Sequence, residues 1–207
     1  MIKKLTLTAL LATAFVSASV ANAATVSYQF GNLLSGSFTP SGVFATLDVT
    51  TTDNITYDFT LTNNNLNGLF TGGAFVGSML VDSTSDKKEP LPSATLVGSG
   101  NGIISIDSSN GGGPGGDYDF RYVFGGGDAD RLEGLEVVSW TSTFMVAHIL
   151  GGNAFALHVQ GLTENQGGSA FYTPGTPLNG VPVPASLPLM ASALGLFGVY
   201  KRRNSKK

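Results

Sequence analysis

Residues 43–62 read VFATLDVTTTDNITYDFTLT, and this stretch decides the fold. Apolar side chains occupy alternate positions on both sides of a short polar connection, Thr51 to Asn54. Strict alternation puts apolar residues on one face of a β-strand, and Thr, Asp and Asn are frequent turn formers. The stretch therefore predicts an antiparallel hairpin with one face in a core. Its predicted core-facing residues are Ala45, Leu47, Val49, Ile55, Tyr57, Phe59 and Leu61.

The same two-residue period recurs over residues 24–174, the predicted body of the protein. Gly, Asn and Pro separate the apolar stretches, and none of these stretches has a capped 3.6-residue repeat. This pattern predicts an all-β fold, an antiparallel β-sandwich with a jelly-roll-like arrangement as one form of it. We expect the last core strand at 154–161, with the chain leaving the domain along 171–174. The other predicted strands are 26–30, 73–82, 95–98, 102–106, 118–124, 135–140 and 144–150.

The charges divide into two basic ends and an acidic body. The body holds all 14 acidic residues and only four of the 11 basic ones, so its formal charge is 4 − 14 = −10. An acidic surface repels nucleic acid and anionic lipid headgroups, so neither is an expected partner, whereas cations or neutral polysaccharide would suit it. The count Cys 0 excludes thiolate metal sites, thiol catalysis and disulfides.

Residues 1–23 have the pattern of a secretory signal peptide. Two lysines and an apolar stretch over 5–20 precede Ala21 and Ala23, which supply the small-x-small pattern of a signal-peptidase site. We therefore expect export through the Sec translocon, cleavage by signal peptidase, and a mature chain that begins at Ala24.

The C-terminal end has three parts in a fixed order. A linker and proline-spaced leader over 175–184 precede the uncharged apolar run 185–200 and the basic tail 201–207. The run predicts a transmembrane helix, although sixteen residues reach only ~24 Å of a ~30 Å hydrocarbon core. Basic residues beside a span stay on the cytoplasmic side, so the body is expected on the other side. The predicted membrane-stop residues are Lys201, Arg202 and Arg203.

This end resembles the PEP-CTERM sorting signal in its VPLPA-like variant, over about an eighth of the chain. The leader that carries the resemblance is Val181, Pro182, Val183, Pro184 and Ala185, followed by Leu187, Pro188, Leu189, Gly195, Gly198 and the basic cluster. Val183 stands where the family has its name-giving Glu, which affects the exosortase subtype expected to read the signal. The resemblance implies processing by an exosortase, a membrane cysteine protease or transpeptidase of Gram-negative bacteria. It also implies an exported protein linked to exopolysaccharide and biofilm; an ordinary C-terminal tail anchor is the alternative.

Residues 125–132, GGGDADRL, are similar to the calcium-binding nonapeptide repeat, with Asp128 and Asp130 as candidate ligands. Asp117 and Asp119 follow a second glycine-rich stretch and offer two more carboxylates. However, the repeat needs stacked copies, and only one copy is present. Solvated loops are the alternative, so we expect no resident cofactor, with Ca²⁺ as a candidate ion at these carboxylates.

His148 and His158 flank a Gly-Gly-Asn turn signal and are expected on the two arms of a hairpin. A three-residue turn would put them on one face within ~7–8 Å, whereas a two-residue turn would put them on opposite faces. A zinc or copper site is therefore one interpretation. Packed structural histidines are the other.

Catalysis has little support in the sequence, because GxSxG, GKS and HExxH motifs are all absent. Glu133 and Glu136 are closely spaced, but we expect them in a solvated turn. The aromatic residues that could form a sugar-stacking face, or else lie in the core, are Trp140, Tyr57, Tyr118, Tyr122 and Tyr172. The sequence thus favours a non-enzymatic protein that passes through the inner membrane to the cell surface or the extracellular matrix. Its expected role there is structural or adhesive; a carbohydrate-binding or glycan-processing module is the alternative.

Overall fold

The computed structural model describes residues 23–83, 91–97, 102–108, 114, 118–125, 131–148, 150–175 and 178–179. These residues form one 12-stranded sheet, and every strand pair in it is antiparallel. The predicted all-β antiparallel class is therefore confirmed. Within these ranges, no helix combines the length and the apolar character that a membrane crossing requires.

The strands are β1 Ala24–Ser35, β2 Ala45–Thr51, β3 Thr56–Asn63, β4 Phe75–Val81, β5 Ser93–Leu96, β6 Ile103–Ser108, β7 Phe120–Phe124, β8 Leu132–Glu133, β9 Val137–Thr143, β10 Phe155–Gln160, β11 Ser169–Pro174 and β12 Leu178–Asn179. Three short helical turns complete the described secondary structure: α1 Leu66–Leu69, η1 Gly152–Ala154 and η2 Glu164–Gln166. Most predicted strands are present, with ends that differ by a few residues.

The predicted hairpin is confirmed as β2 and β3, which pair from Ala45↔Asn63 to Thr51↔Tyr57. Its turn is stabilised by the side chain of Asp53, whose Oδ1 accepts hydrogen bonds from the backbone N–H groups of Ile55 at 2.9 Å and Thr56 at 2.7 Å. These bonds favour the carboxylate and hold the pKa of Asp53 below its usual value. The predicted apolar face of the hairpin is buried, apart from Ile55 in the turn.

The strand order is β5-β9-β3-β2-β1-β11-β10-β4-β7-β6, with β12 added to β1 and β8 to β4. A sandwich prediction implies two separately bonded sheets, whereas here one sheet is continuous because β1 serves both halves. Residues from Ala24 to Phe30 pair with β2, and those from Phe30 to Ser35 pair with β11. The register with β11 shifts on either side of Asn32, and such bulges bend a strand.

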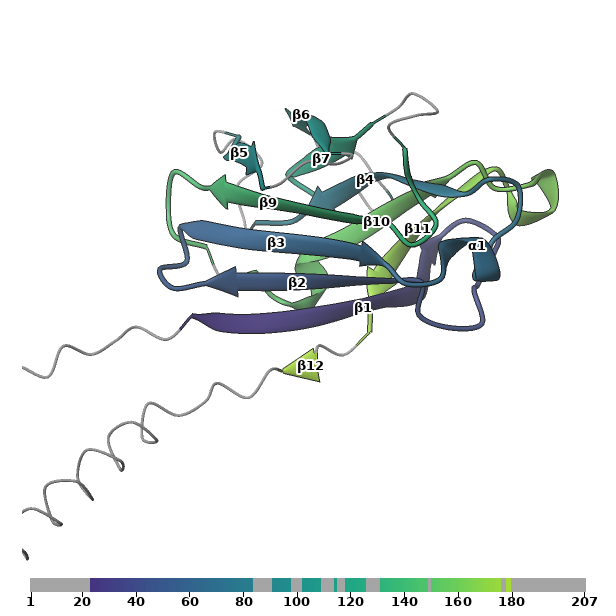
Figure 1. The fold of residues 1–207 in the computed structure, drawn as a ribbon, viewed down its shortest axis with the longest axis horizontal. Helices are drawn as coiled ribbons and strands as arrows, with labels where there is room; N and C mark the ends of the chain where they lie inside the picture. The colour runs from purple at the N-terminus through teal and green to yellow at the C-terminus, as the bar shows by residue number, and fades with distance from the viewer. Residues whose placement is uncertain are drawn as a thin grey trace, which may run out of the picture. The chain divides into compact units, whose positions relative to one another are not determined.

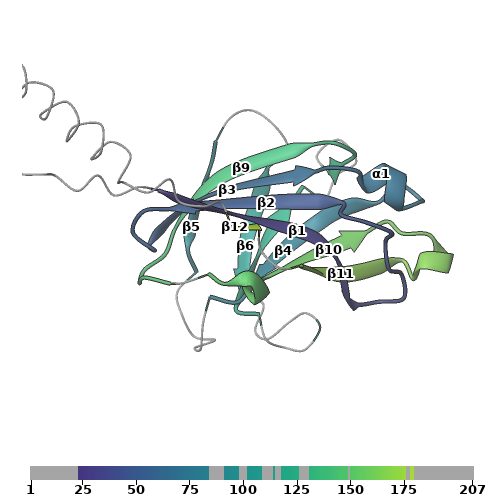
Figure 2. The ribbon, with the colours of Figure 1, turned by 90° about the horizontal axis from the view of Figure 1, so that it is seen from below.

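The two halves of the sheet face each other, as Figures 1 and 2 show for β1, β2, β3 and β9 against β4, β10 and β11. Phe59 on β3 lies 6.3 Å from Phe155 on β10, measured between ring centroids. Trp140 on β9 lies 5.2 Å from Tyr122 on β7, whose hydroxyl donates to Ser142 Oγ at 2.7 Å. These partners are several strands apart in the sheet order, so the sheet folds back on itself around one aromatic core.

The position of β11 corrects the prediction that the last core strand is 154–161. Residues 169–174 do not lead away from the domain but lie between β1 and β10. Ala170, Tyr172 and Pro174 point into the interior, and Tyr172 is 0% exposed. After β11, the Gly175 N–H donates to the Gln29 carbonyl at 2.9 Å, and β12 then pairs with β1 through Val26↔Asn179.

The predicted strand 144–150 is also wrong. After β9 the chain bends, and the N–H groups of Phe144 and His148 donate to the carbonyls of Ile55 and Asn54 at 2.9 and 2.7 Å. This segment therefore closes the turn end of the β2–β3 hairpin. Phe144 and His148 are buried by that contact and not by pairing in a sheet, whereas Met145 and Val146 are 72% and 51% exposed.

Candidate functional site

Several predicted site residues lie outside the described part of the chain. They are Ala21, the leader 181–185, the membrane-stop residues 201–203, and the candidate calcium ligands Asp128 and Asp130, together with Asp117. Of the predicted cleavage-site residues, Ala23 is exposed and Ala24 is the first residue of β1. The sorting and calcium assignments therefore stay predictions.

The structure separates the two histidines that the sequence puts on one hairpin. His148 follows β9, is 4% exposed and packs edge-on against Phe144 at 5.0 Å. His158 lies in β10 and stacks on Phe171 at 4.2 Å with an angle of 4° between the rings. β9 and β10 are not neighbours in the sheet, so the expected hairpin is wrong and the two rings do not form one site.

Two of the carboxylates considered as site residues, Asp119 and Glu136, have structural partners. Asp119 Oδ2 accepts hydrogen bonds from the backbone N–H and the hydroxyl of Ser83, at 2.8 and 2.9 Å. Glu136 accepts from the Glu133 N–H at 2.7 Å and lies in the turn between β8 and β9, as predicted. Within the described ranges, no three His, Asp or Glu side chains gather into a group that could hold a metal ion.

The aromatic residues considered for a sugar-stacking face belong to the core. Trp140, Tyr122 and Tyr172 are 0% exposed, and Tyr57 and Tyr118 are 2% and 5% exposed. Phe59 stacks on Trp140 at 5.1 Å with an angle of 17° between the planes. The stacking-face interpretation is therefore wrong for these five residues, because four of the rings fill the main core and Tyr118 is buried in a second cluster with Leu80 and Ala156.

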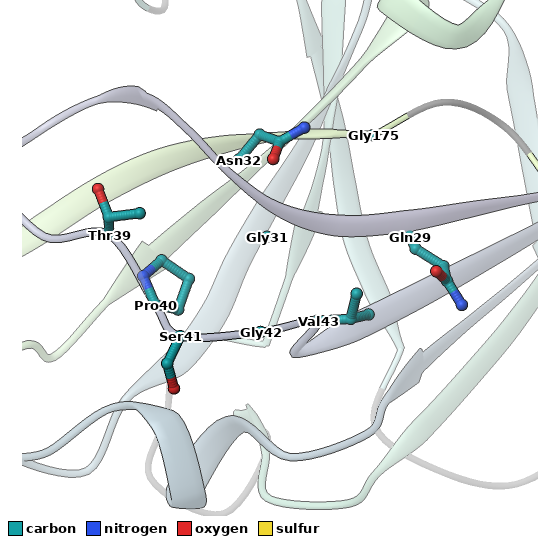
Figure 3. A pocket seen from close by; sticks show the side chains of 9 residues that line it. All are labelled: Gln29, Gly31, Asn32, Thr39, Pro40, Ser41, Gly42, Val43 and Gly175. Carbon is teal, nitrogen blue, oxygen red and sulfur yellow. The ribbon is translucent and has the colours of Figure 1, made fainter.

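A groove of about 400 Å³ lies where β1 bends. Figure 3 shows Asn32 and Gly175 on one side of it, residues 40–43 on the other, and Gly31 between them. Its lining residues are Gln29, Gly31, Asn32, Thr39, Pro40, Ser41, Gly42, Val43 and Gly175. No lining residue is ionisable, so the groove is a neutral, hydrogen-bonding surface on an acidic protein.

Glycine at position 31 lets the two walls approach each other. A Cβ added there would lie 2.9 Å from the Gly42 carbonyl oxygen, which is closer than such contacts normally occur. Gly31 also falls at the first register shift between β1 and β11. A glycine inside a strand pattern is the sequence signal that could have located this bend, since it often marks a bulge or a close backbone approach.

His158 gives a testable pH dependence. Burial, with a smaller contribution from the positive charge of Arg121, lowers the pKa of His158 to about 4, below its ordinary value of 6.5. As the pH falls from 6.5 to 4, the unfolded chain binds a proton that the folded chain does not, so the free energy of unfolding decreases across this range. Because the ring is partly exposed, we expect a decrease of about 1–2 kcal/mol from this residue.

The measurement is thermal or urea unfolding of the wild type and of His158→Gln between pH 7 and pH 4. The variant should lose less stability over this range, because Gln does not titrate there. Carboxylates titrate in both proteins and cancel in the comparison. Identical pH slopes for the two proteins would contradict the assignment.

Comparison with protein-family models, curated proteins and solved structures finds no match for this chain.

Proposed function

We propose that the chain is an exported protein that an exosortase sorts to the cell surface or the extracellular matrix, where it has a structural or adhesive role. In this proposal residues 1–23 are a signal peptide, residues 185–200 are a transmembrane helix, and the body between them is on the outer side of the inner membrane. The observation that carries the proposal is the pattern of the two ends. Lysines precede an apolar stretch at the N-terminal end, a basic tail follows an apolar run at the C-terminal end, and the body between them has a formal charge of 4 − 14 = −10.

The way the body ends supports this arrangement. Val26 and Asn179 are Cα partners across β1 and β12, so the two ends of the body lie side by side at the start of β1 (Figure 1). Neighbouring strands lie ~4.8 Å apart. A domain whose ends leave side by side can fold while both flanking segments are held in the same membrane, since neither end has to cross the domain.

Deletion of residues 181–207 tests the proposal. The last described strand ends at Asn179, so the body should keep its unfolding temperature, while the protein should shift from the membrane and surface fractions to the soluble exported fraction. The measurements are cell fractionation with immunoblotting and intact-mass analysis of recovered protein, which reports both processing cuts. A matched control deletes only 204–207, which retains the leader, the apolar run and Lys201 to Arg203. Surface delivery that is unchanged by the larger deletion would count against sorting by this segment.

The alternative function is a carbohydrate-binding or glycan-processing module. The buried aromatic residues do not support it, but the groove does. Glycosidic hydrolysis requires two carboxyl groups across the bond, and none lines the groove. The groove therefore favours sugar binding over processing. Both as a structural or adhesive protein and as a sugar-binding module, the chain is proposed to act outside the cytoplasm without catalysing a reaction.

A further inference from the structure

We propose that the groove at the bend of β1 is a binding site for a neutral saccharide. This proposal deepens the proposed function by assigning the ligand class of its adhesive role, but it concerns binding alone and does not depend on how the chain is sorted. It rests on three properties of the groove: its size, its lack of charge and its unused hydrogen-bonding side chains.

The size and composition of the groove suit one or two sugar rings. Small-molecule sites have volumes of ~300–1,000 Å³, and this groove, at about 400 Å³, lies in the lower part of that range. Side-chain amides and hydroxyls donate and accept hydrogen bonds, as sugar hydroxyls do. Val43, which is 38% exposed, adds a small apolar surface beside them, against which the C–H face of a sugar ring can pack.

The fold leaves most of these polar groups available. Asn32 donates one amide hydrogen to the Pro174 carbonyl at 3.4 Å. Within the described part of the chain, the side chains of Gln29, Thr39 and Ser41 form no hydrogen bond with the protein. These groups do not hold the bend together, so a ligand can use them without disrupting the fold.

The absence of charge in the lining selects the ligand. The body carries a formal charge of 4 − 14 = −10, which repels anionic polysaccharides, and no Lys or Arg in the groove offsets this repulsion. A cationic ligand finds no carboxylate there. A lipid tail would need a longer apolar lining than Pro40 and Val43 provide. A neutral, hydroxyl-rich ligand remains.

Two glycines provide a blocking variant with a matched control. The Cβ positions of Gly42 and Gly151 both have no atom within 4 Å, and neither residue is among the glycines with positive φ, so both tolerate a side chain. Gly42 lines the groove, and Gly151 does not. Gly42→Phe should therefore obstruct the groove without unfolding the protein, and Gly151→Phe should leave the groove open.

The experiment measures binding of the full chain, purified in detergent, to immobilised glucan, mannan and galactan, with alginate as an anionic comparison. We expect retention on at least one neutral glycan and none on alginate. Gly42→Phe should weaken this binding at least about tenfold, and Asn32→Ala about two- to tenfold, as expected for one lost hydrogen bond. Gly151→Phe should bind like the wild type.

Three results would overturn the proposal: no retention on any neutral glycan, equal binding by Gly42→Phe, or binding of alginate alone. Unfolding temperatures of all variants identify any loss that comes from misfolding, and Asn32→Ala provides a second test if Gly42→Phe is unstable. Sorting is tested separately by the deletion of residues 181–207. A protein that binds glycan but is not sorted, or is sorted but does not bind, would therefore show which of the two proposals fails.

Discussion

A body that ends at Gly168 is expected not to fold, whereas one that ends at Asn179 should fold cooperatively. The shorter chain lacks β11, which lies between β1 and β10. The loss leaves two strand edges unpaired in the middle of the sheet and removes Tyr172, which is 0% exposed. Truncation of one large aromatic core residue alone costs ~3–5 kcal/mol, and a domain of this size has only ~5–15 kcal/mol of stability.

The contacts of Tyr172 explain the size of this effect. Its ring packs against Phe44 at 5.1 Å and Phe70 at 5.6 Å, and its hydroxyl donates to the Phe38 carbonyl at 2.8 Å. Phe38 and Phe44 lie in the β1–β2 connection, and Phe70 follows α1. β11 therefore fixes segments from the first part of the chain. Loss of β11 therefore removes support from both halves of the sheet at once.

Far-UV and near-UV circular dichroism with thermal unfolding make the comparison. A third chain that ends at Gly175 keeps β11 and lacks only β12, whose pairing with β1 involves two residues, so it should remain folded with a small loss of stability. A cooperative transition in the chain that ends at Gly168 would show that β11 is dispensable, which is incompatible with its place in the sheet.

The sequence could predict the local parts of this fold. The β2–β3 hairpin and its buried face are confirmed, because one strict alternation and one Asp-containing turn determine them. The alternation does not predict the strand at 169–174, because Phe171 and Tyr172 are adjacent apolar residues that interrupt it. The structure explains this break: Tyr172 faces the main core, and Phe171 packs on a second buried cluster formed by Leu80, Tyr118 and Ala156.

The groove could not be predicted, since its walls meet through pairings that are distant in sequence. Phe30 pairs with Pro174 on one side and with Ala45 on the other, and only these pairings bring Gly175 beside Asn32. The prediction of a strand at 144–150 is wrong for the same reason, a contact between segments distant in sequence. Phe144 and His148 are buried by the distant hairpin turn, so their apolar pattern reflects a tertiary contact and not a strand.

The replacement Trp140→Ala is expected to lower the free energy of unfolding by about 3–5 kcal/mol. Trp140 is 0% exposed, and its ring contacts Phe59 on the adjacent strand at 5.1 Å. It also contacts Tyr122 and Phe124 of the facing half at 5.2 and 5.9 Å. Alanine would leave a cavity at the junction of the two halves, and interiors of folded proteins do not collapse fully around such a loss.

Urea unfolding followed by circular dichroism measures this loss, because Trp140 is the one tryptophan of the chain and its fluorescence disappears in the variant. Trp140→Phe keeps part of the aromatic packing and should lose clearly less. Leu135→Ala, at a side chain that is 74% exposed, should change stability by less than ~0.5 kcal/mol. A loss below about 1 kcal/mol for Trp140→Ala would contradict the position of its ring in the core.

The position of Trp140 in the core also separates the effects of folding and of binding. Glycan binding that disappears in Trp140→Ala would indicate unfolding, whereas binding that disappears in a folded Gly42→Phe would indicate that the ligand occupies the groove.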